Sequence, residues 1–110
     1  MVFVVANIYK NAKLDLTTTD VTTLYTCPAA KTAVFKSILV SEDSGNADTI
    51  TATLTLASAV FSLFKVKAVG ANTTIELLTQ PLVVNEAEIL KFNAATANRL
   101  HVVASYLEIS

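Results

Sequence analysis

Few residues of this chain have the chemistry that a catalytic or metal-binding site requires. His101 is the single histidine, and imidazole is the side chain best suited to move protons near neutral pH. It stands between Leu100 and Val102, inside an apolar stretch, so we expect a structural or interface role rather than that of a general base. Cys27 is the single cysteine and precedes Pro28. We expect a small packed side chain there rather than a reactive thiol, and an intrachain disulfide is excluded.

The acidic residues do not form a recognisable metal or acid/base motif. Glu86 and Glu88 lie two apart and would share one face of a strand, but no Asp or His beside them completes a site. The turn "EDSGNAD" supplies Glu42, Asp43 and Asp48 without the spacing and closing glutamate of a calcium loop. Two isolated glycines cannot build a glycine-rich phosphate loop. We therefore expect a protein that is not an enzyme and uses no metal or cofactor.

Composition favours a binding or structural role. The 110 residues fit one domain, residues 1–110, and 53% of them are hydrophobic whereas 15% are charged. Monomers seldom expose large apolar patches, so a small protein with so neutral a surface is expected to form oligomers. The formal net charge of -1, with no basic cluster, argues against nucleic-acid binding.

The elements that would position these residues are all predicted to be strands. Runs with a period of two, separated by turn residues, predict an all-β fold: a single-domain antiparallel β-sandwich, jelly-roll-like, with about eight strands. Some runs are expected to merge or to be irregular. The predicted strands cover residues 2–9, 13–18, 21–26, 32–42, 48–58, 60–69, 73–79, 81–84, 87–93 and 99–109.

The opening "MVFVVANIYK" is predicted to be a strand rather than a signal peptide, because it lacks a basic start and a cleavage site. Residues 1–10 could form an edge strand or a strand exchanged with a neighbour. No apolar stretch has the length that a membrane-spanning helix needs, so we expect no membrane partner.

The segment "DTITATLTLA" alternates most regularly. Threonines occupy one face, and apolar residues occupy the other, which is typical of a half-buried strand. The runs at 32–42, 60–66 and 99–109 are instead apolar on both faces, which indicates cover from loops or from a neighbouring subunit. The residues expected at a subunit or capsid interface are Val2, Val4, Thr49, Thr51, Thr53, Thr55 and Tyr106.

Two long segments resemble short virion-associated β-proteins of tailed bacteriophages. In residues 24–55, "LYTCPAAKTAVFKSILVSEDSGNADTITATLT" is similar to a turn of the type Tyr-Thr-x-Pro-Ala-Gly-Lys-Thr that leads into a "KSI" strand, a Ser/Asn/Gly turn and a Thr-alternating strand. In residues 77–110, "LLTQPLVVNEAEILKFNAATANRLHVVASYLEIS" resembles the usual ending. Ala30 departs from the pattern, because glycine is usual there. Alanine disfavours positive φ, so we expect a type I turn.

The resemblance implies a structural virion protein. We expect a capsid decoration (cement) protein that binds the outer surface of the head as a homo-oligomer, with a trimer favoured, contacts the major capsid protein or other virion proteins, and is made in the host cytoplasm. A tail, baseplate or head-fibre subunit is the alternative within this class. A host-glycan-binding module is the alternative from another class, although 7% aromatic residues and the lack of tryptophan weigh against it.

Overall fold

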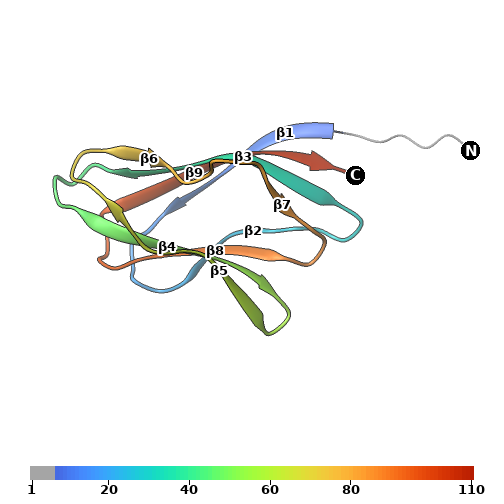
Figure 1. Ribbon diagram of the computed structural model, residues 1–110, viewed down its shortest axis with the longest axis horizontal. Coiled ribbons are helices and arrows are strands. Elements are labelled where there is room, and N and C mark those ends of the chain that lie inside the picture. Colours follow the sequence, from blue (N-terminus) through green and yellow to red (C-terminus); the bar gives the residue numbers. More distant parts are fainter. Residues whose placement is uncertain (1–6) are drawn as a thin grey trace, which may run out of the picture.

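The computed structural model describes residues 7–110, which form two antiparallel sheets packed face to face (Figure 1). Within residues 7–110 no helix is long and apolar enough to cross a membrane. The strands are β1 (Asn7–Asp15), β2 (Thr22–Thr26), β3 (Thr32–Glu42), β4 (Asp48–Leu56), β5 (Ala59–Val69), β6 (Thr74–Glu76), β7 (Leu82–Val84), β8 (Ile89–Ala94) and β9 (Leu100–Ile109).

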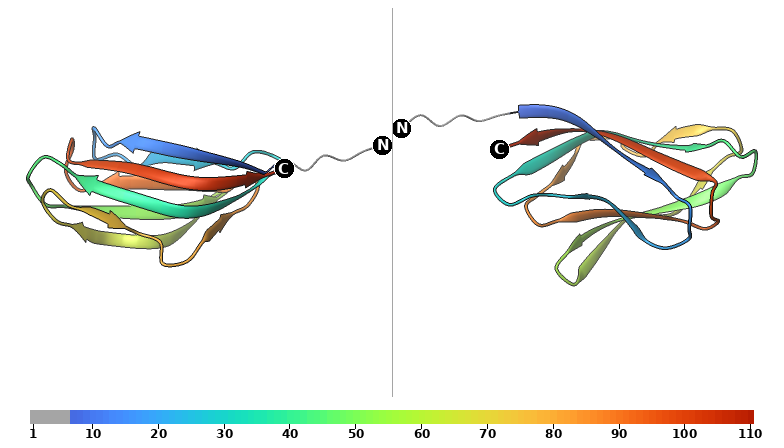
Figure 2. Two further views of the ribbon diagram at one scale, coloured as in Figure 1. Left: turned by 90° about the horizontal axis from the view of Figure 1, so that it is seen from above. Right: turned by 180° about the vertical axis from the view of Figure 1, so that it is seen from behind.

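The strand order defines the predicted jelly roll. The first sheet, sheet A, has the order β1-β9-β3-β6, and β7 also pairs with β3. The second, sheet B, has the order β2-β8-β4-β5. Because β6 and β7 pair with successive parts of β3, they act as two halves of one interrupted strand. Eight strand positions in two sheets connected in this order make a jelly roll, and Figure 2 shows the two layers from above and from behind.

Nine strands are therefore observed in the described residues where ten runs were predicted. The difference lies at the start, where the runs at 2–9 and 13–18 were expected to be separate. From Asn7 onward they are parts of β1, which pairs with β9 without interruption as far as Asp15. The polar residues Lys10, Asn11 and Lys13 do not break this strand, because β1 lies at the sheet edge and their side chains are exposed.

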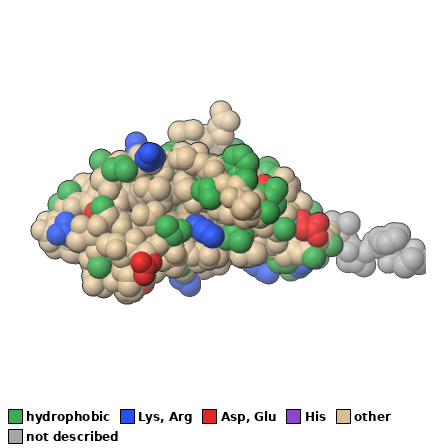
Figure 3. Space-filling model, turned by 90° about the horizontal axis from the view of Figure 1, so that it is seen from below, with side chains coloured by type: hydrophobic (Ala, Val, Ile, Leu, Met, Phe, Trp, Pro, Cys, Tyr) green, Lys and Arg blue, Asp and Glu red, His purple; other side chains and the backbone are tan. Residues whose placement is uncertain are grey.

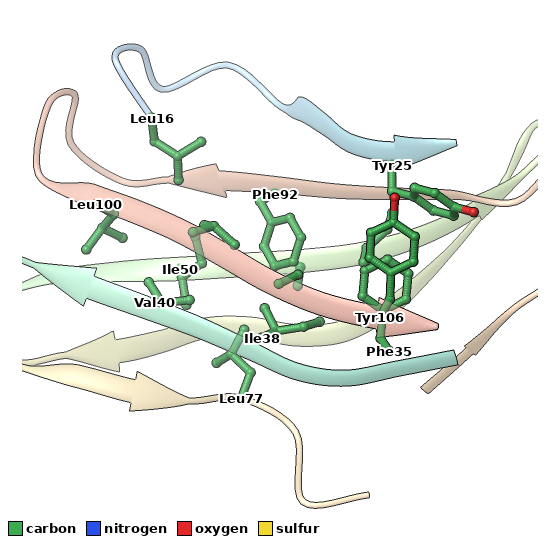
Figure 4. Packing of buried hydrophobic residues seen from close by; sticks show 14 of the residues in the cluster. Leu16, Tyr25, Phe35, Ile38, Val40, Ile50, Leu77, Phe92, Leu100 and Tyr106 are labelled. Carbon is green, nitrogen blue, oxygen red and sulfur yellow. The ribbon is translucent and has the colours of Figure 1, made fainter. Parts of the chain in front are cut away.

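The core lies between the sheets and is filled mainly by alternate residues of β3, β4, β8 and β9. Its largest fully buried side chains include Phe35, Phe92, Ile38, Ile50 and Leu90. At one end three rings pack together: Phe35 stacks on Tyr106 with centroids 4.7 Å apart, and Tyr25 contacts both rings (Figure 4). Offset and edge-to-face ring pairs of this kind stabilise a core beyond the area that they bury.

The turn before β3 differs from the expectation. Ala30 adopts φ 62, in the turn closed by the hydrogen bond from Lys31 N to Pro28 O. The predicted avoidance of positive φ at this alanine was therefore wrong. The Ala30 N–H donates to Glu86 Oε1 at 2.9 Å, and this contact helps to hold the strained conformation in place.

Replacing Ala30 by glycine should stabilise the protein. Glycine adopts positive φ without the Cβ clash, so we expect Ala30→Gly to raise the free energy of unfolding by about 0.5–1 kcal/mol. Urea denaturation would measure the change. Ala29→Gly is the control, because Ala29 does not have positive φ and glycine there should destabilise by a similar amount. Equal decreases in the free energy of unfolding for Ala30→Gly and Ala29→Gly would contradict the strain at Ala30.

Candidate interaction surfaces

His101 lies on the outer face of sheet A, at the start of β9, between two exposed carboxylates. Its Nε2 is 3.2 Å from Asp15 Oδ1, and its Nδ1 is 3.8 Å from Asp43 Oδ2. Ser41 stands opposite His101 in the strand register, but both ring nitrogens face carboxylates. The arrangement connects β1, β9 and the β3–β4 loop, and it does not direct the imidazole at a nucleophile.

Cys27 and the glutamate pair form turn contacts. Cys27 is buried, as predicted, and its Sγ donates to Lys31 O at 3.2 Å. Glu86 and Glu88 do not share a strand face, because they lie in the turn before β8. Glu88 Oε1 accepts the Asn85 N–H at 2.6 Å. Within residues 7–110 no group of three His, Cys, Asp or Glu side chains could hold a metal ion.

Glu42 organises two loops, a role that the sequence pattern did not reveal. Its buried carboxylate accepts the backbone N–H groups of Ser44, Gly45, Asn46 and Asn72 at 2.9–3.1 Å and the Ser44 hydroxyl. Burial by itself raises the pKa of Glu42, but these hydrogen bonds outweigh it and lower the pKa to about 2. The side chain therefore fixes the β3–β4 and β5–β6 loops against each other.

Glu108 is a second buried carboxylate, at the aromatic end of the core. It accepts hydrogen bonds from Lys10 Nζ at 2.9 Å, from Tyr25 Oη at 2.8 Å and from Lys31 Nζ at 3.4 Å. The hydrogen bonds from Lys10 and Tyr25 lower the pKa of Glu108 despite its burial. Its donors come from β1, β2 and the loop before β3, so this ion pair network holds the two sheets together where the three rings pack.

The threonine face of β4 lies on the outside of sheet B, as the alternation predicted. Thr49, Thr51 and Thr53 are half-buried, and Thr53 stands opposite Lys91 of β8. Thr51 Oγ1 accepts the N–H of Val66 at 3.1 Å. Thr55, on the same face, is buried and offers little surface to a partner.

The β4–β5 hairpin projects from the sandwich (Figure 1). It exposes large apolar side chains. The exposed fractions are 43% for Leu56, 64% for Val60, 55% for Phe61 and 60% for Val66. Leu56 belongs to the core face of β4, but here the hairpin extends beyond the opposite sheet. In Figure 3, which looks at the side of the molecule from which the hairpin projects, hydrophobic side chains lie among lysines and polar atoms.

Val66 has the backbone geometry that marks strain. It adopts φ 54, which is rare for a β-branched residue, at an irregularity in the β4–β5 register. Lys65 and Lys67 flank it, and both are exposed. Bulges and lysines are the devices by which edge strands avoid pairing with other chains.

An apolar groove of about 250 Å³ separates β5 from the β6–β7 connection. Its apolar lining consists of Leu63, Phe64, Leu77, Leu78, Pro81 and Leu82. The lining contains no charged side chain, which favours an apolar occupant.

An apolar row crosses the outer face of sheet A. Tyr9, Leu107, Val34 and Val83 stand opposite one another on β1, β9, β3 and β7. Tyr9 and Val83 are exposed, and the other two are half-buried. The two-sided pattern of residues 32–42 and 99–109 thus corresponds to strands with one face in the core and an apolar row on the other.

The remaining predicted interface residues have different outcomes. Val2 and Val4 lie outside the described residues. Tyr106 is 6% exposed and stacks on Phe35 inside the core, a position that does not support an interface role. No family model matches the chain, and no curated protein is detectably similar to it.

Proposed function

We propose that this chain is a structural virion protein of a tailed bacteriophage. It is a capsid decoration (cement) protein that binds the outer surface of the head as a homo-oligomer, a trimer being favoured, and stabilises the head. The proposal is supported by the resemblance of residues 24–55 and 77–110 and by the jelly-roll fold, an architecture found in viral capsid domains among others. Since fold alone does not define function, the argument depends on the surface.

The observation that carries the proposal is the exposed apolar hairpin. Val60, Phe61 and Val66 are each more than half exposed. Extended apolar surface on a small domain marks a protein–protein contact. Together with the apolar row on sheet A, the hairpin gives the domain two separate surfaces for neighbours.

Two contact surfaces suit a protein that covers a lattice. One surface can join copies of the chain, and the other can bind the capsid. An oligomer then engages several capsid subunits at once, so that modest affinities multiply through effective concentration. The half-buried threonines of β4 supply a flat surface whose hydroxyls can exchange hydrogen bonds with the capsid.

The proposal is tested by mixing the purified protein with emptied phage heads and sedimenting them. We expect a discrete oligomer by light scattering that co-sediments in a fixed ratio to the capsid lattice. Heads that carry it should withstand heat and osmotic shock better than heads without it. Protein that stays in the supernatant would contradict the capsid role, and binding to tails or to a glycan array would then identify one of the alternatives.

Substitutions on the threonine face test the capsid contact. Thr49→Lys combined with Thr53→Lys should abolish co-sedimentation, while Thr51 is kept because its hydroxyl holds Val66. The matched control is Thr17→Lys combined with Thr19→Lys, in the exposed β1–β2 loop, which should bind normally. Normal binding by the first variant would show that the threonine face meets only water.

A further inference from the structure

The free edge of β5 is divided into a protected part and an open part. In the described chain β5 pairs with β4 and with no other strand, so its outer edge offers unpaired backbone groups. Over residues 65–69 the bulge at Val66 and the two flanking lysines protect this edge. Over residues 59–63 the strand has no charge, and Val60 and Phe61 are exposed.

The chain carries a segment with matching properties. Residues 1–6, "MVFVVA", contain no charge, glycine or proline. Fully extended they span about 20 Å, enough to cover residues 59–63. Both faces of such a strand would be apolar, with Val2 and Val4 on one side and Phe3 and Val5 on the other. The open edge is two-sided in the same way, because the neighbours Val60 and Phe61 point to opposite faces of sheet B.

The position of β1 favours a second copy as the acceptor. β1 lies at the edge of sheet A that packs over β2, whereas β5 lies at the opposite edge of sheet B, three strands from β2. Reaching its own β5 would use about 14 Å of the roughly 20 Å that the segment spans, which leaves too little of it to cover residues 59–63. A neighbouring copy can present its hairpin directly.

We propose that residues 1–6 of one copy add as a strand to the β5 edge of a second copy, at residues 59–63. The added strand gains main-chain hydrogen bonds with β5, while its side chains cover Val60 on one face and Phe61 on the other. The groove beside Leu63 and Leu78 borders the inner face of this site. Donor and acceptor are different surfaces, so the contact is heterologous and closes into a ring when the rotation permits. This contact between two copies of the chain requires no virion component.

Two lysine substitutions separate donor from acceptor. Val4→Lys removes an apolar side chain from the donor, and Val60→Lys removes one from the acceptor. Each should weaken self-association measured by analytical ultracentrifugation at least about 10-fold, because burial of a valine is worth that much or more. Val21→Lys is the matched control, since Val21 is 61% exposed and Val60 is 64% exposed. It should associate as the unmodified chain does.

Mixing the two variants gives the decisive result. The Val4→Lys chain keeps an intact acceptor and the Val60→Lys chain keeps an intact donor, so a 1:1 mixture should form dimers that neither forms alone. A mixture that stays monomeric would overturn the proposal. An unmodified chain that is monomeric at tens of micromolar concentration would also overturn it. If Val60→Lys lost association while Val4→Lys kept it, the proposal would be overturned as well, and direct pairing of two β5 edges would be indicated. Capsid binding by a monomer would refute the exchange and leave the virion role standing.

Discussion

Phe35→Ala is expected to lower the free energy of unfolding by about 3–5 kcal/mol, the usual cost of removing a fully buried ring. Phe35 is 0% exposed and stacks on Tyr106, while Tyr25 meets it edge-on with centroids 5.3 Å apart. Its removal leaves a cavity between the sheets and disturbs the ring whose hydroxyl donates to Glu108. Because small domains are stable by only about 5–15 kcal/mol, a large share of the total stability is lost.

Urea denaturation followed by tyrosine fluorescence or circular dichroism measures this loss. Phe35→Leu serves as a second variant if the alanine form does not fold. Its free energy of unfolding should lie between those of the unmodified protein and of Phe35→Ala. Val83→Ala is the control, because Val83 lies on the neighbouring strand β7 but is 48% exposed; its cost should stay within about 0.5 kcal/mol. A loss below about 1 kcal/mol for Phe35→Ala would show that the aromatic cluster is not part of the cooperative core.

Glu42→Gln is expected to lower the melting temperature at pH 7 by about 5–10 °C. The unmodified carboxylate accepts four backbone N–H groups from two loops. Glutamine has one acceptor oxygen, and it turns an N–H₂ group toward the same donors. The two loops therefore lose their common anchor, and the end of the sandwich at which they lie should open first.

The pH dependence gives this prediction a distinctive form. The pKa of Glu42 is about 2 in the folded protein, below its ordinary value of 4.5. A lowered pKa means that its stabilisation is fully present above about pH 4.5 and is lost as the pH falls through about 2. The difference in melting temperature between the two proteins should therefore shrink over that range.

Glu86→Gln is the matched control for Glu42→Gln. Glu86 is exposed and accepts the Ala30 N–H, so its substitution should shift the melting temperature by no more than about 2 °C. Equal shifts in the two variants, or a difference for Glu42 that does not change between pH 5 and pH 2, would contradict the anchoring role.

The sequence by itself determined the strands and the fold class. The apolar runs and the turn residues between them predicted β3 over residues 32–42 without error and placed β4 and β9 within two residues of their observed bounds. For β4 the signal was strict alternation, because side chains of a strand must point to opposite faces. The Thr face of β4 was correctly separated from the core face for the same reason. The scarcity of catalytic residue types was also visible directly, since it is a property of composition.

Only the tertiary structure decided which residues have special roles. Glu108 receives its hydrogen bond from Lys10, which is 98 residues away, and Asn72 reaches Glu42 across 30 residues. No local pattern encodes such partners. Tyr106 could be read as a surface residue until the packing of Phe35 placed it in the core. Ala30 and Val66 hold positive φ against their own preference because hydrogen bonds from Ala30 to Glu86 and from Val66 to Thr51 fix them. Local preferences specify strands, whereas contacts between distant residues decide burial, charge and strain.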